Sequence, residues 1–464
     1  MPAFGLLSVL GAAAAFISSN SNAHVAAIPR HNGYQHGRPG WGHNHAHYGT
    51  ASRSYPSVAT TGTGTAPLST GTATPGNVTH DFPETIRGVN LGGWLILEKW
   101  MNSTLFDGTD SSDQYTFDQT SDAPAKLQNH WDTYICEDDF RQIAALGINT
   151  VRIPIGYWAY DPDSSPYLTG ADKYMEKALD WARKYDLKVL VDLHGSPGSQ
   201  NGFDNSGKSG EVNWQSGDNM KKSISILEIM AKKYGSMDYA DVVWGLELVN
   251  EPLSWNPNNF TLNKAWAQEA TNAVRAKAAN ENLMVIMHDS FVNPKQWIKT
   301  GAAINGNATA ETARFGMDRH LYQNQEDSDS ELNQDQHIEK ACKWANTDLL
   351  GRDNKLPVIV GEFSAATNIC AYPDYTTSAG DSCTVEGCQC SCDVWIEHWD
   401  QPLVQATRKF VEAQLDAFER GSKGWFMWSW KGPGAWGLQN AAKYGLIGEK
   451  VTDRKYPDQC HNYF

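Results

Sequence analysis

The sequence has no basic stretch and no second long apolar run. Its 464 residues include 53 Asp and Glu against 38 Lys and Arg, which gives a net charge of −15. An acidic chain without a basic stripe is a poor partner for nucleic acid or an anionic membrane. After the first 23 residues, no apolar run approaches the roughly 18 residues that a membrane-spanning helix needs. We therefore expect neither nucleic acid nor a membrane as a partner. We also expect a monomer.

Several catalytic signatures are also missing. The sequence contains no Gly-rich phosphate loop, no Gly-x-Ser-x-Gly turn and no His-Glu-x-x-His helix. Cys383, Cys388, Cys390 and Cys392 cluster, but their spacing is unusual for zinc and favours a loop tied by disulfides. The chemistry expected below needs neither a metal nor a cofactor.

The first 80 residues contain no acidic residue at all. An apolar run over residues 4–17 precedes Ser21-Asn22-Ala23, a pattern typical of a cleaved secretory signal over residues 1–23. Residues 24–80 are rich first in His and Gly, then in Ser and Thr, and predict a disordered linker that carries O-linked sugars. The His cluster is interpreted as a solvated tail rather than a metal site. A catalytic domain is expected over residues 81–464.

Secretion exposes a chain to disulfide formation and to N-glycosylation. Eight cysteines in a secreted chain favour disulfides. Sequons at Asn77, Asn102, Asn259 and Asn307 predict N-glycosylation on the same route. We expect a secreted protein, either extracellular or held in a cell wall.

Eight short apolar runs alternate with amphipathic segments after residue 81. They occupy residues 87–93, 149–155, 188–194, 243–250, 282–289, 314–322, 357–363 and 424–430. Continuous runs rich in Val and Ile are typical of parallel strands that are covered on both faces. The alternation predicts a (β/α)8 barrel, with a doubly wound open sheet as the competitor.

Polar side chains stand at the carboxyl ends of nearly all of these runs. They are Asn90, Arg152, His194, Asn250, Glu251, His288, Asp289, His320, Tyr322, Glu362 and Trp428. In a barrel these ends converge on one mouth, where active sites lie. An open sheet gives no reason for such a ring, so the barrel is favoured.

Glu251 and Glu362 end the fourth and seventh runs. Two carboxyl groups on either side of a glycosidic bond are the requirement for its hydrolysis, one as acid/base and the other as nucleophile. We expect Arg152 and Tyr322 to keep Glu362 ionised. Burial and the second carboxylate should raise the pKa of Glu251, so that this group begins as the acid.

The remaining strand-end groups suit a sugar pocket. Asn250 is placed to donate to a sugar 2-hydroxyl, and His194 and His320 to hydrogen-bond within the pocket. Of the 18 tryptophans, Trp100 and Trp428 are the two that we expect to stack on sugar rings.

At these residues the sequence resembles glycoside hydrolase family 5, and within it the fungal exo-β-1,3-glucanases. The resemblance covers residues 84–460. It rests on RGVNLGGW at 87–94, VRIPIGYW at 151–158, DLHGSPGSQNGFDNSG at 192–207, NEP at 250–252, GE at 361–362 and TDR at 452–454, with Cys460.

The resemblance implies Glu251 as acid/base and Glu362 as nucleophile. It further implies a terminal-glucose subsite and two disulfides, Cys342–Cys460 and Cys370–Cys383. The implied substrate-binding residues are Glu98, Arg152, His194, Phe203, Asn205, Asn250, His320, Tyr322 and Trp428.

The sequence departs from the family pattern at Gln325, where close relatives often carry a second entrance aromatic. The pairing of Cys136 stays open. We expect a retaining exo-β-1,3-glucanase that releases glucose from β-glucan by double displacement. The alternatives are a β-glucosidase or β-1,6-glucanase of the same fold, or a weakly catalytic glucan-binding wall protein.

Overall fold

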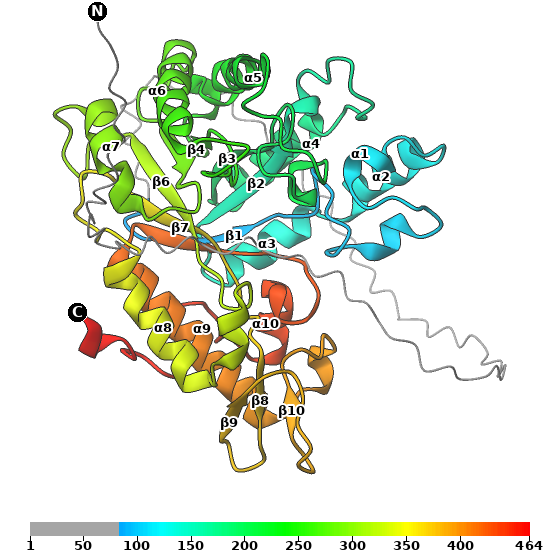
Figure 1. The fold of residues 1–464 in the computed structure, drawn as a ribbon, viewed down its shortest axis with the longest axis vertical. Coiled ribbons are helices and arrows are strands. Elements are labelled where there is room, and N and C mark those ends of the chain that lie inside the picture. The colour runs from blue at the N-terminus through cyan, green and yellow to red at the C-terminus, as the bar shows by residue number, and fades with distance from the viewer. Residues whose placement is uncertain (1–82) are drawn as a thin grey trace, which may run out of the picture.

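Eight short parallel strands pair side by side and close on themselves in the computed structural model, which describes residues 83–464 (Figure 1). Their order around the barrel is β1-β11-β7-β6-β5-β4-β3-β2. The strands are β1 Ile86–Asn90, β2 Thr150–Gly156, β3 Lys188–Gly195, β4 Val243–Glu247, β5 Met284–His288, β6 Phe315–His320, β7 Val358–Phe363 and β11 Gly424–Met427. The predicted (β/α)8 barrel is confirmed. The open-sheet alternative is wrong, because β1 pairs with both β2 and β11.

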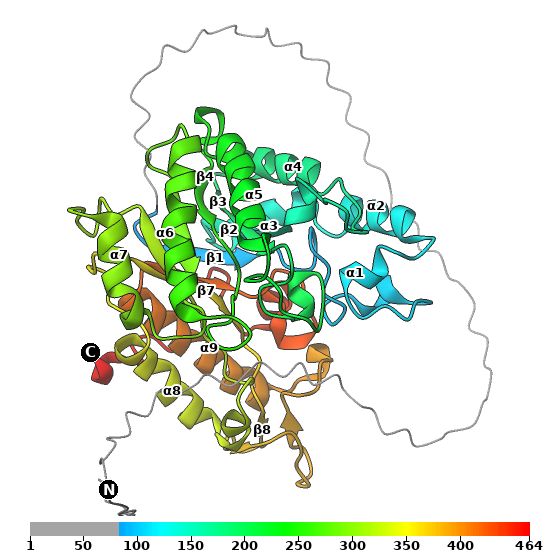
Figure 2. The ribbon, with the colours of Figure 1, turned by 45° about the horizontal axis from the view of Figure 1, so that its top comes forward.

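Helices surround the barrel (Figures 1 and 2). They are α3 Glu137–Ala145, α4 Asp172–Lys184, α5 Asn219–Tyr234, α6 Phe260–Lys277, α7 Ile298–Asn305, α8 Gln334–Thr347, α9 Gln401–Gly421 and α10 Leu438–Tyr444, with the short α1 Gln114–Phe117 and α2 Ala123–Thr133 after β1. In α4, the buried Tyr174, Ala178 and Ala182 recur at helical spacing on the face that meets the barrel. Asp400 caps α9 by accepting from the Leu403 amide.

Inward-facing side chains change from apolar to polar along the barrel axis. One layer consists of seven buried side chains: Ile86, Leu190, Trp244, Met284, Ile286, Ile359 and Phe426. Because side chains alternate along a strand, the inward positions after Leu190 in β3 are Asp192 and His194. The apolar layer therefore closes the floor, and the polar groups gather above it at the carboxyl ends.

A segment between β7 and α9, residues 364–400, forms a small antiparallel sheet of its own. Its strands β8 Ile369–Ala371, β9 Thr377–Ala379 and β10 Gln389–Cys390 pair in the order β10-β8-β9. We call residues 364–400 the insert. Figure 1 shows it beside α10.

The disulfides of the insert correct one expectation. Cys370 bonds Cys390, and Cys383 bonds Cys388, so the Cys370–Cys383 pairing is wrong. All four sulfur atoms lie within 4.8 Å of one another. The antiparallel register places Cys370 opposite Cys390, which decides the pairing in a way that sequence spacing cannot. Cys392 is unpaired and exposed.

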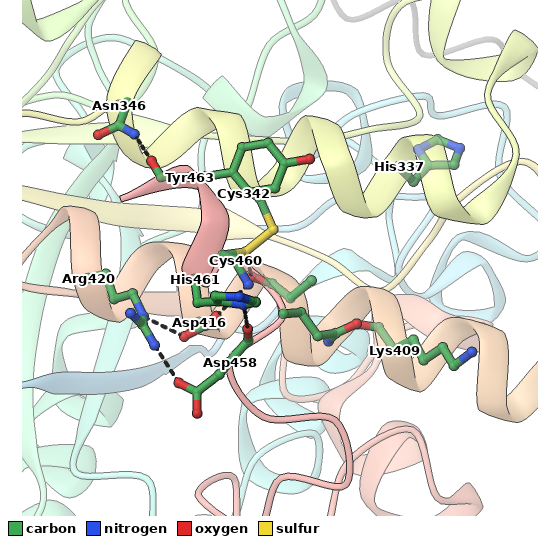
Figure 3. The surroundings of a disulfide bond; sticks show 12 residues. His337, Cys342, Asn346, Lys409, Asp416, Arg420, Asp458, Cys460, His461 and Tyr463 are labelled. Carbon is green, nitrogen blue, oxygen red and sulfur yellow. Dashed lines mark hydrogen bonds and ion pairs between the residues drawn. A yellow bond between two sulfur atoms is a disulfide. The ribbon is translucent and has the colours of Figure 1, made fainter.

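The other disulfide ties α8 to the C-terminal segment (Figure 3). Cys342 bonds Cys460 across a sequence separation of 118 residues, as the resemblance implied. The Cys460 amide also donates to Asp416 of α9 at 2.9 Å, so the C-terminal segment is held against two helices. Cys136, whose partner the sequence left open, is unpaired and exposed.

The expected signal over residues 1–23, the whole linker over residues 24–80 and the sequon at Asn77 lie outside the described residues. Within residues 83–464, no helix is both long enough and apolar enough to cross a membrane.

Candidate active site

Glu251 and Glu362 meet at the carboxyl end of the barrel. Glu362 lies within β7, whereas Glu251 follows β4 by four residues. Each keeps only 5% of its surface exposed. Glu251 has a positive φ of 48°, which is uncommon for a residue with a side chain and costs backbone energy. The fold therefore holds this carboxylate in an unfavourable backbone conformation at the mouth.

Glu362 has the two partners expected for it. Arg152 Nη1 donates to Oε1 at 3.0 Å, and the Tyr322 hydroxyl donates to Oε2 at 2.7 Å. Burial raises the pKa of Glu362, and the Glu251 charge adds to this effect, while His320 and Arg152 oppose it. The net direction is upward, so these contacts position Glu362 without lowering its pKa below the ordinary value.

Glu251 behaves differently from the expectation. Burial raises its pKa, but the hydrogen bond and charge of His320 and the amide of Asn205 outweigh burial, and the net pKa is lowered. His320 Nδ1 lies 2.8 Å from Oε1, and Asn205 Nδ2 donates to Oε2 at 2.9 Å. The prediction of a raised pKa is therefore wrong for the substrate-free protein, because His320 supplies a cationic partner.

His320 joins the two glutamates. Its Nδ1 lies 2.8 Å from Glu251 Oε1 and 3.4 Å from Glu362 Oε2. The two carboxylate oxygens can be no farther apart than these two distances combined, about 6.2 Å. The other ring nitrogen, Nε2, lies 3.2 Å from Asp318 Oδ2. Burial lowers the pKa of His320, but Glu362, Asp318 and Glu251 outweigh burial and raise it well above its usual range.

Arg152 is the centre of the polar layer and is fully buried. Besides Glu362, it donates to Glu247 Oε2 at 2.8 Å, Asn90 Oδ1 at 3.0 Å and Asn250 Oδ1 at 2.9 Å. The bond to Asn250 fixes that amide and leaves its Nδ2 3.4 Å from His194 Nε2. The Asn250 amide is thus held in a fixed orientation between Arg152 and His194, and its expected bond to a sugar 2-hydroxyl stays a prediction.

Three buried acids support this layer and were not predicted: Asp192, Glu247 and Asp318. Asp192 lies 3.1 Å from Arg152 and 2.6 Å from His194 Nδ1, and Asp318 accepts from the Gly361 amide at 2.6 Å. A Cβ at Gly361 would lie 1.9 Å from Asp318, so glycine is required directly before Glu362. The available signal was a carboxylate two residues before a strand-end histidine, in Asp192-x-His194 and Asp318-x-His320.

Trp428 stacks on His194, with ring centroids 5.6 Å apart and planes inclined by 11°. Its indole also lies against Gly92, where a Cβ would be 2.6 Å from the ring. The backbone just after β1 therefore approaches the indole closely, and Trp428 forms one wall of the polar layer.

Aromatic residues form the rim of the mouth. Trp100 Nε1 donates to Glu98 Oε2 at 2.9 Å, and burial raises the pKa of Glu98 well above its usual range. The Trp436 ring lies 5.0 Å from Trp100 and 5.4 Å from Tyr322, centroid to centroid. Sequence reasoning did not assign Trp436 to the site; it belongs to η8 Gly434–Trp436, after β11.

The loop after β3 carries two further predicted residues. Asn201 Nδ2 donates to Asn205 Oδ1 at 3.1 Å, which directs the other end of that amide toward Glu251. Phe203 is half-buried on the same loop, two residues earlier. The structure thus places the predicted residues on loops and strand ends of one barrel face, and the role of the Phe203 ring stays a prediction.

Carboxylates and imidazoles approach one another here as closely as metal ligands do. Glu251, His288 and His320 form one such group, and Glu247, Asp318 and His320 another. Hydrogen bonds from the two His320 nitrogens to Glu251 and Asp318 account for the contacts of His320 in both groups.

Three predicted glycosylation sites fall on described residues. Asn259 and Asn307 are exposed, and Asn102 is half-buried beside His130. Asn259 also caps α6 by accepting from the Thr261 and Leu262 amides through Oδ1. Modification of these residues stays a prediction.

Comparison with known proteins gives a consistent picture. The profile described as Cellulase (glycosyl hydrolase family 5) matches residues 117–433. The chain is 39% identical over 394 residues to a probable glucan 1,3-beta-glucosidase A of Emericella nidulans, across 82% of this chain and 93% of that protein. It is also 39% identical over 402 residues to glucan 1,3-beta-glucosidase 2 of Wickerhamomyces anomalus, across 81% and 90% respectively.

Among solved structures, a rutinosidase from Aspergillus niger superposes with a TM-score of 0.60 at 23% identity, over 78% of this chain and 98% of that one. This likeness supports the fold. The family profile spans more than half of the chain, and the curated relatives align over most of it. The chain therefore belongs to glycosyl hydrolase family 5, and it is a glycoside hydrolase.

Proposed function

We propose that this protein is a secreted, retaining exo-β-1,3-glucanase, with Glu362 as nucleophile and Glu251 as acid/base. The observation that carries the proposal is that one nitrogen, His320 Nδ1, lies within 3.4 Å of both carboxylates. It limits the separation of their nearer oxygens to about 6.2 Å. Retaining glycosidases hold their carboxyl groups about 5–5.5 Å apart, whereas inverting enzymes need roughly 6.5–9.5 Å to admit a water. This upper bound lies below the inverting range and supports double displacement.

The roles follow from the partners of each group. Arg152 and Tyr322 fix both oxygens of Glu362, so that one oxygen is aimed at the anomeric carbon. Attack forms the bond from Glu362 to that carbon and breaks the glycosidic bond. Water then replaces Glu362 in the second step, with Glu251 as the base.

The acid role of Glu251 requires a proton, which the free protein keeps on His320. This proton moves from Nδ1 to Glu251 Oε1 along their 2.8 Å hydrogen bond. The imidazole left behind is neutral, and its remaining N–H donates to Asp318. Glu251 then protonates the leaving oxygen of the departing sugar.

The substrate is assigned through the relatives. The curated proteins matched over 81–82% of the chain carry the name glucan 1,3-beta-glucosidase. Gln325, a half-buried residue three positions after Tyr322, replaces an expected entrance aromatic and favours the β-1,6-glucanase or β-glucosidase alternative. The disulfides, the exposed sequons and the expected signal support secretion.

The test compares initial hydrolysis rates on β-1,3-, β-1,4- and β-1,6-linked glucose disaccharides. We expect the β-1,3 disaccharide to react fastest. Glu362→Gln should lose at least about 10³-fold in kcat, because the nucleophile is removed. Glu281→Gln is the matched control, since Glu281 is exposed at the opposite end of the barrel, before β5. Normal turnover by Glu362→Gln would refute the assignment, and a faster β-1,6 rate would replace the proposed linkage.

A further inference from the structure

The insert exposes an unusual share of large apolar side chains. Of the nine large apolar residues that are exposed within residues 83–464, four belong to the insert. They are Tyr375, Val385, Val394 and Trp395. Trp395 has the largest exposed fraction of the nine, 61%. Tryptophan is normally largely buried, so an indole with this exposure calls for a physical reason.

The backbone around Trp395 is well fixed. The Trp395 amide donates to Asp393 Oδ1 at 2.9 Å, and the Trp395 carbonyl accepts from the His398 amide at 2.9 Å. The buried Trp399 donates through Nε1 to the Asp393 carbonyl at 2.9 Å. The indole is therefore presented to solvent from an anchored turn, which lowers the entropic cost of stacking a ligand on it.

This turn is continuous with the rim of the active site. A Cβ at Gly434 would lie 3.1 Å from the Val394 backbone, so these two segments of the chain are in contact there. Gly434 begins η8, whose last residue Trp436 contacts Tyr322, and Tyr322 donates to Glu362. In Figure 1 the insert lies beside α10, and η7 Ile396–His398 contacts that helix. A line of contacts thus runs from the nucleophile to the turn that carries Trp395.

The chemistry of the surroundings selects a neutral ligand. Asp393 and Glu397 flank Trp395 in the chain and are exposed, so an anionic polymer would be repelled. A glucose unit is uncharged, and the apolar face of its ring matches an indole face, while carboxylates at the edge accept hydrogen bonds from its hydroxyls.

We propose that Trp395 is a distal sugar platform that binds outer glucose units of the β-glucan chain whose end occupies the Glu251–Glu362 site. The inference rests on the proposed function. It predicts that the enzyme gains affinity for chains long enough to pass over the rim at Trp436 and reach the insert.

The experiment measures kcat/KM for the full chain on β-1,3-linked glucose oligomers of increasing length. Trp395→Ala should leave the disaccharide rate unchanged and lower kcat/KM for long oligomers by about two- to tenfold, through KM. Trp395→Phe should recover part of the loss. Tyr375→Ala is the matched control, because it removes another exposed aromatic of the insert, at the turn between β8 and β9.

The outcomes are separable. A loss confined to long oligomers supports the platform. Equal kcat/KM for Trp395→Ala and wild type at every length overturns it, as does an equal loss at every length, which would mean a structural role. A molar mass that falls in Trp395→Ala would show that a second copy of the chain covers the indole, and it also overturns the proposal. If wild type cleaves no β-1,3 oligomer, the proposed function itself fails.

Discussion

Replacing Asp318 by asparagine tests the proton path most sharply. Asp318 is fully buried, accepts from the Gly361 amide and lies 3.2 Å from His320 Nε2. The introduced amide can still accept from Gly361 through its oxygen, so the fold should survive. Its NH₂ group then faces Nε2, which must become an acceptor. The only ring proton is thereby confined to Nδ1, and the neutral imidazole can no longer supply it to Glu251.

The magnitude follows from the size of general acid catalysis. Positioned acids contribute about 10²–10⁴-fold, so Asp318→Asn should lower kcat/KM on a disaccharide by about 10²-fold. An aryl glucoside with an activated leaving group needs no proton, and its kcat/KM should change by less than about threefold. This difference between substrates separates a positioning role from a loss of folded protein.

The pH dependence supplies a second readout. His320 has a raised pKa, because Glu362, Asp318 and Glu251 outweigh burial. The stability that its protonation contributes is present below its ordinary pKa of 6.5 and is lost as pH rises through the raised value. Removing the Asp318 charge should lower the pKa of His320, so that His320 stays protonated over a narrower pH range. The alkaline limb of kcat/KM should therefore move to lower pH. Equal losses on both substrates, with an unmoved alkaline limb, would refute the reasoning.

Three further changes have defined expectations. Replacing Cys342 and Cys460 by serine opens a 118-residue loop and should lower the free energy of unfolding by about 4–5 kcal/mol, seen as a lower midpoint in urea. Burial raises the pKa of Asp118 to about 7 despite its bonds to Leu168 and Gln114, so stability is lost as pH rises from about 4 through 7. Asp118→Asn should flatten that dependence and stabilise the protein at pH 8 by about 2–4 kcal/mol, measured by Tm against pH. Arg152→Lys should cost about 3–5 kcal/mol in urea titration, because one ammonium cannot replace the forked contacts of the guanidinium.

The barrel and its paired glutamates could be predicted because both leave a local trace. Each buried strand is a short apolar run, and each run ends in a polar residue. Topology then brings those ends together whatever the loop lengths. Glu251 and Glu362 needed no knowledge of side-chain geometry to be singled out.

The supporting acids left a weaker trace. Asp318 lies inside a strand, where a lone carboxylate is uninformative until the structure shows the Gly361 amide of the neighbouring strand donating to it. The lowered pKa of Glu251 depends on the position of the His320 ring, which arrives from β6. The position of this ring relative to Glu251 is set by the tertiary structure, and no spacing in the sequence encodes it.

The cysteines predicted a disulfide-tied loop in the insert, which is confirmed, but its strands were missed for a different reason. Its strands are two or three residues long, too short to show an alternating pattern. The Cys370–Cys383 pairing that the resemblance implied is wrong, because the register of β8 against β10 places Cys390 opposite Cys370.

The most direct test of the account is the anomeric configuration of the first product. Proton NMR of a soluble β-1,3-glucan in the first minutes of hydrolysis should show glucose alone, released as the β-anomer, because two displacements through Glu362 restore the starting configuration. Initial release of the α-anomer would contradict the nucleophilic role of Glu362 and the spacing argument on which the account rests.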